Sequence, residues 1–432
     1  MTRREWLAMT AAGAAGALIL PTRALAQSGA DADLERRIGR VVHEFEQQGF
    51  HRTGTAVDQR SGDWLCEEVK RIGLVPARES FPLSRVDPVQ GRLIVEGRAL
   101  EGLPLFDAAF TDADGIRGRM GPINSDAEIG LAEAAPNTAA AGPLGDGRRQ
   151  QRHKAIVCVT RGGRPGLCPN NADYFTNPFG PPVLQVSSEE SSVLRGHAER
   201  GTPVHLIAEV KRTTTIAVNV TTRIAGVNAA LPPLVVMTPR SGWYWCASER
   251  GGGMVCWLEL MRSLHAIRPA RDVLFVASSG HELGHLGINA FVERRQNIIS
   301  NAVGWMHFGA NIGAAIVPGD AAQPDNDPER RNATAASGGG NTIQASDDGF
   351  EAIVSGAMTS AQLGIRRRIP RGTLPGGEAE VVHRGGGRYL SVIGSNALFH
   401  NPEDRGANAV DLGVIARFTA AFAAVARTLV AA

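Results

Sequence analysis

Short apolar runs alternate with amphipathic stretches through the second half of the chain. The runs at 234–237, 273–277 and 302–308 are bounded by polar or turn-forming residues, as buried strands are. Apolar positions recur at helical spacing in 253–264, 286–294 and 350–363. Strands that alternate with helices predict a mixed, mostly parallel sheet with helices on both of its faces.

The segment from about 89 to 212 follows a different pattern. It is rich in Gly and Pro and contains short apolar runs at 156–162, 182–186 and 204–210. We therefore expect a β-rich unit that is inserted into the α/β sequence. Within it, the Gly- and Arg-rich stretch 142–151 predicts a loop.

Composition is that of a soluble globular protein, with 432 residues, 43% hydrophobic residues and 20% charged residues. This length predicts two or three domains. A formal net charge of +2 gives no indication of a nucleic-acid partner or of an anionic membrane surface.

The first 26 residues have the features of an export signal. Arg3 and Arg4 precede a short apolar run at 11–20, and Ala24-Leu25-Ala26 is a small-residue cleavage site. This order predicts a twin-arginine signal peptide at 1–26 and a periplasmic or secreted mature protein. The apolar run is too short to span a bilayer, so we expect no stable membrane insertion.

Cysteine spacing excludes the simplest structural zinc site. The chain has five cysteines and no C-x-x-C pair, so a zinc ribbon is not expected. Two short-loop disulfides are compatible with an oxidising compartment, and the sequence leaves both open. The candidate pairs are Cys158 with Cys168 and Cys246 with Cys256.

The most informative stretch follows the apolar run at 273–277. A Ser-Gly turn there delivers His281 and Glu282 at the carboxyl end of a strand, where open α/β sheets bind their ligands. The residues His281-Glu282-Leu-Gly-His285 also fit H-E-x-x-H. In zincin hydrolases that pattern places two imidazoles on a zinc ion and a Glu as the base, so a zincin-like site of His281, Glu282 and His285 is one alternative.

Several motifs in sequence order resemble the secreted zinc-dependent exopeptidases, the co-catalytic di-zinc aminopeptidases and glutamate carboxypeptidase relatives. Gly280-His-Glu-Leu-Gly284 resembles their G-E-E-L-G, and Phe399-His-Asn-Pro-Glu-Asp404 resembles their Y-H-T-x-x-D. Asn219-Val220 matches their N-V, and 154–162 resembles a strand of the protease-associated insert. The resemblance covers nearly the whole mature chain. It implies the zinc exopeptidase fold, with peptidase-like parts at 27–88 and 213–432 and a β-rich insert at 89–212.

The resemblance also assigns roles to individual residues. It implies metal ligands at Glu249, Glu282 and His400, and it places His307 where the family has a further ligand Asp. His281 stands at the position of the general-base Glu, so His281 and Glu282 are the candidate catalytic residues. Substrate-binding or neighbouring roles fall to Arg240, Arg250, Trp243 and Trp245.

One of the family's two metal positions is altered. Thr238 and Arg240 replace its zinc-binding His and the Asp that orients that His. The positive charge of Arg240 opposes a second dication, so we expect one zinc ion rather than two, although two are not excluded. The resemblance implies a metal-dependent hydrolase of peptide or related amide bonds. The alternative from another class is a catalytically inactive binding protein on the same fold.

Overall fold

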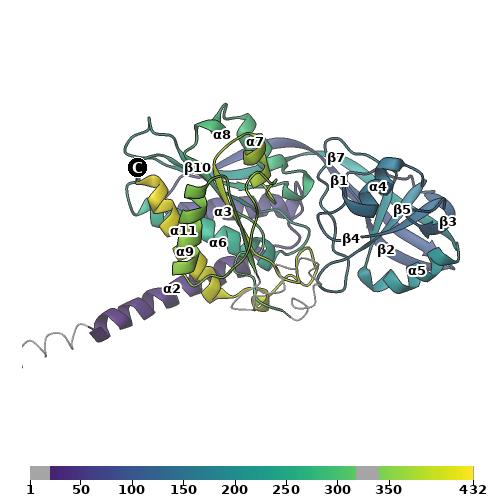
Figure 1. Cartoon of the computed structure of the whole chain (residues 1–432), viewed down its shortest axis with the longest axis horizontal. Coiled ribbons are helices and arrows are strands. Elements are labelled where there is room, and N and C mark those ends of the chain that lie inside the picture. The colour runs from purple at the N-terminus through teal and green to yellow at the C-terminus, as the bar shows by residue number, and fades with distance from the viewer. Residues whose placement is uncertain (1–19, 318–339, 432) are drawn as a thin grey trace, which may run out of the picture.

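The computed structural model describes residues 20–317 and 340–431. Figure 1 shows two lobes of unequal size that are joined by a pair of long strands. Most of the predicted signal peptide, at 1–19, lies outside the described residues, so twin-arginine export stays a prediction. The helix α2 (Leu20–Glu46) begins within the segment predicted to be removed.

The larger lobe is built on a mixed sheet that is mostly parallel in its centre. β8, β9, β10 and β13 run parallel to one another, while β7 and β11 pair antiparallel at the two sides. The strand order is β1 (Ala77–Val95), β7 (Pro203–Ile224), β9 (Val273–Ser278), β8 (Leu234–Pro239), β10 (Gly304–Phe308), β13 (Tyr389–Ile393), β11 (Asn341–Ala345) and β12 (Ile365–Arg368). This arrangement confirms the predicted fold class.

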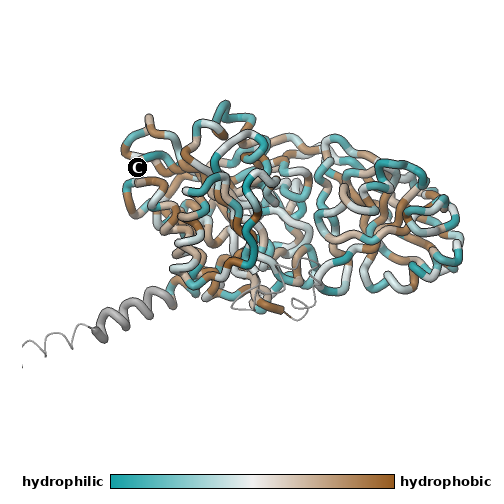
Figure 2. Tube along the Cα trace, in the orientation of Figure 1, coloured by the Kyte–Doolittle hydropathy of each residue, from teal (hydrophilic) through white to brown (hydrophobic). Residues whose placement is uncertain are grey.

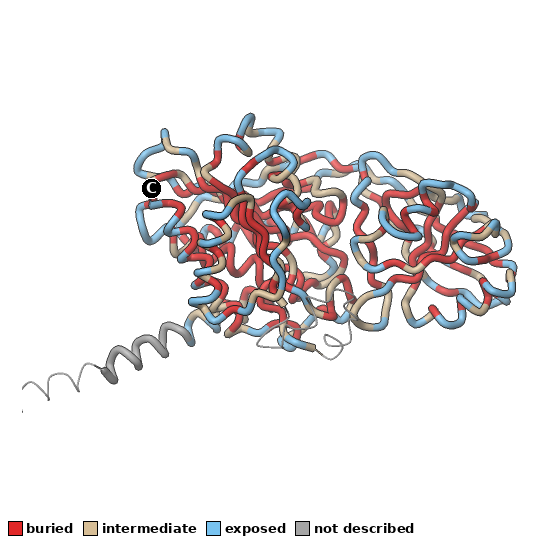
Figure 3. Tube along the Cα trace, in the orientation of Figure 1, coloured by how far each residue is buried: buried red, intermediate tan, exposed pale blue. Residues whose placement is uncertain are grey.

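Helices cover both faces of this sheet because its strands are apolar on both sides. One face packs against α2, α3 (Ala56–Arg71), α6 (Gly252–His265), α9 (Asp348–Ser360) and α11 (Leu412–Val430). The other face packs against α7 (Leu286–Glu293), α8 (Ile298–Asn301) and α10 (Ala379–Arg384). The central strands are buried along their length (Figure 3), and hydrophobic residues gather in the interior of both lobes (Figure 2).

The smaller lobe is β-rich, and its strands pair in a closed circuit. The circuit joins the distal halves of β1 and β7 with β2 (Arg98–Pro104), β6 (Val183–Val186), β5 (Ala155–Thr160), β4 (Ile129–Ala134) and β3 (Ile116–Pro122). α4 (Gly142–Gln150) and α5 (Ser191–Glu199) pack outside it. Its core includes Leu93, Val157 and Leu206. Its identification as a protease-associated insert stays a prediction.

The two lobes share β1 and β7, which pair antiparallel over nearly their whole length. A register shift between Pro88 and Gln90 interrupts the ladder once. The boundaries predicted at 88–89 and 212–213 both fall inside these strands rather than in flexible linkers. The sheet therefore runs continuously from one lobe to the other.

The prediction of a loop at 142–151 is wrong, because residues 142–150 form the helix α4. Leu144 and Arg148, one helical turn apart, are both buried against the smaller lobe. Arg148 forms an ion pair of 2.8 Å with Asp107. These tertiary contacts outweigh the poor helix propensity of the glycines in the segment.

The two candidate disulfides are not formed. All five cysteines are free and buried. The thiols of the expected pairs contact other residues: Cys168 lies against Asn401, Cys246 against Glu249 and Cys256 against Thr419. Burial raises the pKa of the Cys158 and Cys256 thiols to about 12.

One helix among the described residues, α11, is long and apolar enough to cross a membrane by length and composition. In its most apolar window 61% of the residues are buried inside the larger lobe. Such burial is typical of a core helix of a globular protein.

Candidate functional site

The carboxyl ends of β8, β9 and β10 meet at one edge of the sheet, and they deliver the candidate residues there. β8 leads into Arg240 and Ser241, and β9 leads into the turn that carries His281 and Glu282. His307 lies near the end of β10 and is fully buried. Parallel strands place ligands at this edge in open α/β sheets.

The turn after β9 does not have the geometry of a zincin helix. His281–Leu283 forms a single 3-10 turn, and Gly284 and His285 then adopt left-handed backbone conformations before α7 begins. Two histidines four residues apart share one face only within a continuous helix. The rings of His281 and His285 lie 5.0 Å apart and are tilted against each other. The zincin alternative therefore stays a prediction, without the continuous helix that carries both histidines in zincins.

Arg250 is the central side chain of the site. Its Nη2 lies 2.8 Å from Oε1 of Glu249 and 2.7 Å from Oε1 of Glu282. Its Nε donates a hydrogen bond of 2.6 Å to the carbonyl oxygen of Ser241. Arg250 and both carboxylates are almost completely buried. A guanidinium thus bridges two of the three carboxylate and imidazole groups that the resemblance assigns to zinc.

Further hydrogen bonds hold the carboxylate of Glu282 and the backbone of Glu249. The Ser241 hydroxyl donates to Oε2 of Glu282 at 2.7 Å. The Asp404 carboxylate accepts the backbone N–H groups of Ser248 and Glu249 at 2.8 and 2.9 Å. Asp404 therefore fixes the turn that carries Glu249, which gives a structural reason for the last residue of the Phe399–Asp404 motif.

His400 also lies next to Glu249. Its Nδ1 lies 2.6 Å from the carbonyl oxygen of Pro169, and its Nε2 lies 3.4 Å from Oε1 of Glu249. Because a carbonyl oxygen only accepts, Nδ1 carries the proton of this contact. Nε2 is buried and has no hydrogen-bond partner.

His281 and His307 line a cavity of about 420 Å³ beside this cluster. Nδ1 of His307 lies 2.8 Å from the Ser391 hydroxyl, whereas Nε2 of His307 and Nδ1 of His281 have no hydrogen-bond partner. Glu378 is buried next to His281, with Nδ1 of His281 3.7 Å from Oε1 of Glu378. The cavity walls come from both lobes, since Asn137 belongs to the smaller one.

Charge and burial shift the pKa values of these groups. Burial alone would raise the pKa of Glu249, but the charge of Arg250 and the contact with His400 outweigh it and lower this pKa to about 2. Burial and the charge of Arg250 lower the pKa of His281 well below its usual value. Burial lowers the pKa of His307 to about 3 and raises that of Asp404 to about 7. The site therefore holds a carboxylate at Glu249 and neutral imidazoles at His281 and His307 near pH 7.

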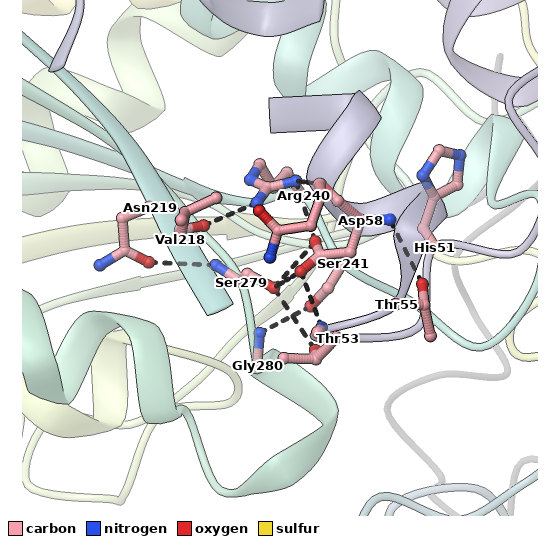
Figure 4. A network of polar contacts seen from close by, with 12 residues as sticks. His51, Thr53, Thr55, Asp58, Val218, Asn219, Arg240, Ser241, Ser279 and Gly280 are labelled. Carbon is pink, nitrogen blue, oxygen red and sulfur yellow. Dashed lines mark hydrogen bonds and ion pairs between the residues drawn. The ribbon is translucent and has the colours of Figure 1, made fainter. Parts of the chain in front are cut away.

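Arg240 and Thr238 are turned into the protein. Arg240 is fully buried and forms an ion pair of 2.9 Å with Asp58 on α3, as Figure 4 shows. Its Nη2 donates to the carbonyl oxygen of Val218 at 2.6 Å. The Thr238 hydroxyl donates to the carbonyl oxygen of Phe308 at 2.9 Å. The charge of Arg240 is thus neutralised by Asp58 rather than directed at a metal position.

Ser279 and Asn219 extend the same polar network across the sheet (Figure 4). The Ser279 hydroxyl donates to Asp58 at 3.0 Å, and the Ser279 N–H donates to the Asn219 side chain at 3.2 Å. The Asn219 amide in turn donates to the carbonyl oxygen of Gly287 at 2.7 Å. The Asn-Val motif therefore holds the turn after β9 in place.

The two tryptophans lie close to the smaller lobe and to the surface. Trp243 is buried against Phe106, and its Nε1 donates to the Asn171 side chain at 3.2 Å. Trp245 is partly exposed beneath Arg405, whose guanidinium lies 4.3 Å from its ring centroid. Neither ring lines the cavity beside His281. Their role in substrate binding stays a prediction.

Sequence reasoning did not single out Ser241, Glu378 or Asp58 as site residues. Each lies far along the chain from the groups it contacts, and no motif marks it. Ser241 alone had a local signal, since it follows Arg240 at the end of a predicted strand.

Zinc is the metal that the fold implies, and the residues present do not fit it. Oε1 of Glu249 and Oε1 of Glu282 both already contact the Arg250 guanidinium. A unit charge and a dication about 4 Å apart repel by about 8 kcal/mol at an effective dielectric of about 20. Within 20–317 and 340–431, no group of three His, Cys, Asp or Glu side chains is arranged to hold a metal ion.

Comparison with solved structures gives strong matches over nearly the whole chain. A zinc aminopeptidase from Bacillus subtilis has a TM-score of 0.71 at 14% identity and covers 92% of this chain and 95% of its own. A Peptidase M28 precursor from Shewanella amazonensis has a TM-score of 0.68 at 13% identity, with 94% and 96% covered. An aminopeptidase from Aneurinibacillus sp. strain AM-1 has a TM-score of 0.65 at 12% identity, with 92% and 94% covered.

No family model and no curated protein matches the sequence itself. The similarity therefore lies in the fold, which confirms the predicted zinc exopeptidase fold. All three of these structures are described as peptidases, one of them as a zinc aminopeptidase and one as an aminopeptidase.

Proposed function

We propose that this chain, which has the fold of the zinc aminopeptidases, binds a peptide or related amide without metal-dependent hydrolysis. The observation that carries the proposal is the position of Arg250 between Glu249 and Glu282. The carboxylates that would ligate a metal are neutralised by a side chain of the protein itself. On this proposal the chain shares the fold and the ligand-binding edge of the sheet with the zinc aminopeptidases, but it does not use a metal ion for chemistry.

The cavity beside the cluster supports a binding role. Its volume of about 420 Å³ is within the usual range for small-molecule sites. Nδ1 of His281 and Nε2 of His307 belong to side chains that line it, and both atoms are buried without a partner. Buried polar atoms are rarely left unpaired unless a ligand or water satisfies them. A peptide amide offers both a donor and an acceptor for these two ring nitrogens.

Metal-dependent hydrolysis is the second candidate, and one observation favours it. Nε2 of His400 and Oε1 of Glu249 approach to 3.4 Å at the same edge of the sheet as Glu282. With one zinc ion these three residues would be its ligands, and zinc would activate a water molecule for attack on an amide. The neutral imidazole of His281 would then be the group that accepts the proton of that water. This candidate requires Arg250 to leave both carboxylates.

Metal analysis of the purified protein separates the two candidates. After incubation with zinc and dialysis, we expect wild type to retain far less than one equivalent of zinc and to hydrolyse no member of a panel of aminoacyl, peptidyl and acyl-amide substrates. One retained equivalent that is lost in His400→Ala, together with hydrolysis, would establish the metal-dependent hydrolase instead.

Peptide binding is tested by calorimetry with a panel of short peptides on wild type. We expect His281→Ala and His307→Ala each to weaken binding roughly tenfold, because each removes one hydrogen-bonding group from the cavity. The exposed His265 is the matched control, and His265→Ala is expected to bind as wild type does. Equal affinities for all four proteins would exclude the cavity as the binding site.

A further inference from the structure

The guanidinium of Arg250 supplies a positive charge to the buried carboxylates of Glu249 and Glu282. Its Nη2 alone contacts both Oε1 of Glu249 and Oε1 of Glu282, so these two oxygens lie within reach of a single cation. We infer that Arg250 is the built-in cation of this site, and that its side chain alone keeps zinc from the set Glu249, Glu282 and His400. The inference shares the interpretation of Arg250 with the proposed function, but it concerns metal binding only.

The histidine of this set is already oriented as a metal ligand. Nδ1 of His400 donates to the carbonyl oxygen of Pro169, and Nε2 is the ring nitrogen that faces Oε1 of Glu249. Metal-binding histidines are held in the same way, with the second ring nitrogen bound to a carbonyl or carboxylate oxygen. His400 is buried and its Nε2 has no partner among the described residues. The ring nitrogen without a hydrogen-bond partner therefore faces one of the two carboxylates of the set.

The groups that support the two carboxylates are also in place. The Ser241 hydroxyl holds Oε2 of Glu282, and Asp404 holds the backbone of Glu249. Such outer contacts orient the ligands of a metal and are independent of which cation they surround. They do not involve the Arg250 guanidinium itself. Its removal should therefore leave these outer contacts in place, while the ligand side chains, which are not now arranged to hold a metal ion, close around a smaller cation.

The charges of Glu249, Glu282 and Arg250 also support this inference. Two carboxylates and one guanidinium carry a net charge of about −1 in a buried site. Without Arg250, two buried like charges would face each other with no counter-ion, which is unfavourable. A zinc ion would neutralise both carboxylates and would gain the imidazole of His400 as a further ligand. Three protein ligands and an open position form a common zinc site.

The experiment measures zinc in the full-length protein after loading and dialysis, with melting temperature as a second readout. We expect Arg250→Ala to retain about one equivalent of zinc and to melt at a higher temperature with zinc than without it. Arg250→Lys keeps a cation and is expected to retain none. Adding His400→Ala to Arg250→Ala should lower zinc affinity at least tenfold, whereas adding His285→Ala should not.

Three results would overturn the inference. One is a stoichiometric zinc in wild type that His400→Ala removes, because Arg250 would then not exclude the metal. Another is a folded Arg250→Ala that takes up no zinc. The third is an Arg250→Ala that stays unfolded even in zinc, as does Arg250→Gln, because zinc is expected to replace the lost cation. Peptide binding by wild type does not enter this test, so the proposed function stands or falls separately.

Discussion

Three of the largest fully buried side chains among the described residues are arginines, and each meets a buried carboxylate. Arg148 pairs with Asp107 in the smaller lobe, Arg240 with Asp58 behind the site, and Arg250 with Glu249 and Glu282 within it. A buried guanidinium is tolerated only when it is paired and hydrogen-bonded. At the scale of the residue, these pairs decide which carboxylates remain available for chemistry.

Loss of the Arg240 side chain should destabilise the protein strongly. Arg240→Met leaves the Asp58 carboxylate buried without its cation, so we expect the free energy of unfolding to fall by about 3–5 kcal/mol. The matched control is Arg92→Ala, which breaks an exposed pair with Glu101 and should cost at most about 1 kcal/mol. Urea denaturation measures both values, and equal losses would contradict the argument.

His51 should make stability depend on pH. Its ring is fully buried and stacked on Phe45, and burial lowers its pKa from 6.5 to about 3. Between these pH values the unfolded chain binds a proton that the folded chain does not. Stability from this group is therefore complete above pH 6.5 and is lost as pH falls, by about 1.4 kcal/mol per pH unit.

The measurement is the midpoint of urea unfolding at pH 5 and pH 7 for wild type and His51→Gln. The glutamine keeps a hydrogen-bond donor for the carbonyl oxygen of Phe45 but does not titrate. We expect a smaller difference between the two pH values in the variant. An unchanged difference would assign the pH dependence to other groups.

At the scale of the element, α11 connects the helix layer to the sheet. It is apolar enough to resemble a membrane span, yet it packs against α2, α6 and α9. The ring of Phe422 stacks on Phe308 of β10 with centroids 4.0 Å apart, and Asp411 caps the first turn. Its hydrophobicity reflects burial between layers, which local composition does not distinguish from lipid exposure.

Truncation of the α11 core should be costly. Phe422→Ala removes a fully buried ring, so we expect the free energy of unfolding to fall by about 3–5 kcal/mol. Thr428→Ala, on the exposed side of the same helix, should change it by no more than about 0.5 kcal/mol. Chemical denaturation of both variants provides the test, and a near-neutral Phe422→Ala would show that α11 is not part of the core.

At the scale of the whole molecule, the shared strands β1 and β7 bring the smaller lobe onto the site of the larger one. Pro169 holds His400, Asn171 binds Trp243, and Ala172 donates its backbone N–H to the carbonyl oxygen of Glu282. The cavity walls come from both lobes. The inserted unit is therefore part of the site and not an appendage.

We propose that the folded molecule is exported. Arg3→Lys combined with Arg4→Lys should leave the full-length precursor in the cytoplasmic fraction, because the twin arginines are the recognised feature of the signal. Arg36→Lys, beyond the predicted cleavage site, serves as control and should be exported as wild type is. Fractionation and immunoblotting report the outcome, and unaffected export of the double variant would exclude this route.

Local patterns were sufficient for the α/β fold class, whereas the zinc exopeptidase fold was inferred from the resemblance of several motifs. The apolar run at 273–277 and the His281-Glu282 turn predicted β9 and the edge of the sheet that carries the site, because alternation and strand length depend on neighbouring residues only. The same reasoning failed at 142–151, where burial of Arg148 against Asp107 creates a helix from a glycine-rich segment. No local rule anticipates a partner that lies far away in sequence.

The sequence by itself determined the α/β architecture, and its motifs marked Glu249, Glu282 and His400 as candidate metal ligands. Only the tertiary structure decided which charged side chains contact these residues. Arg240, expected to oppose a second metal, is neutralised by Asp58, and Arg250 provides the cation between the carboxylates. The physical reason is that a side chain's charge acts over a few ångströms in space. Which charges come that close depends on how strands and helices distant in sequence pack together.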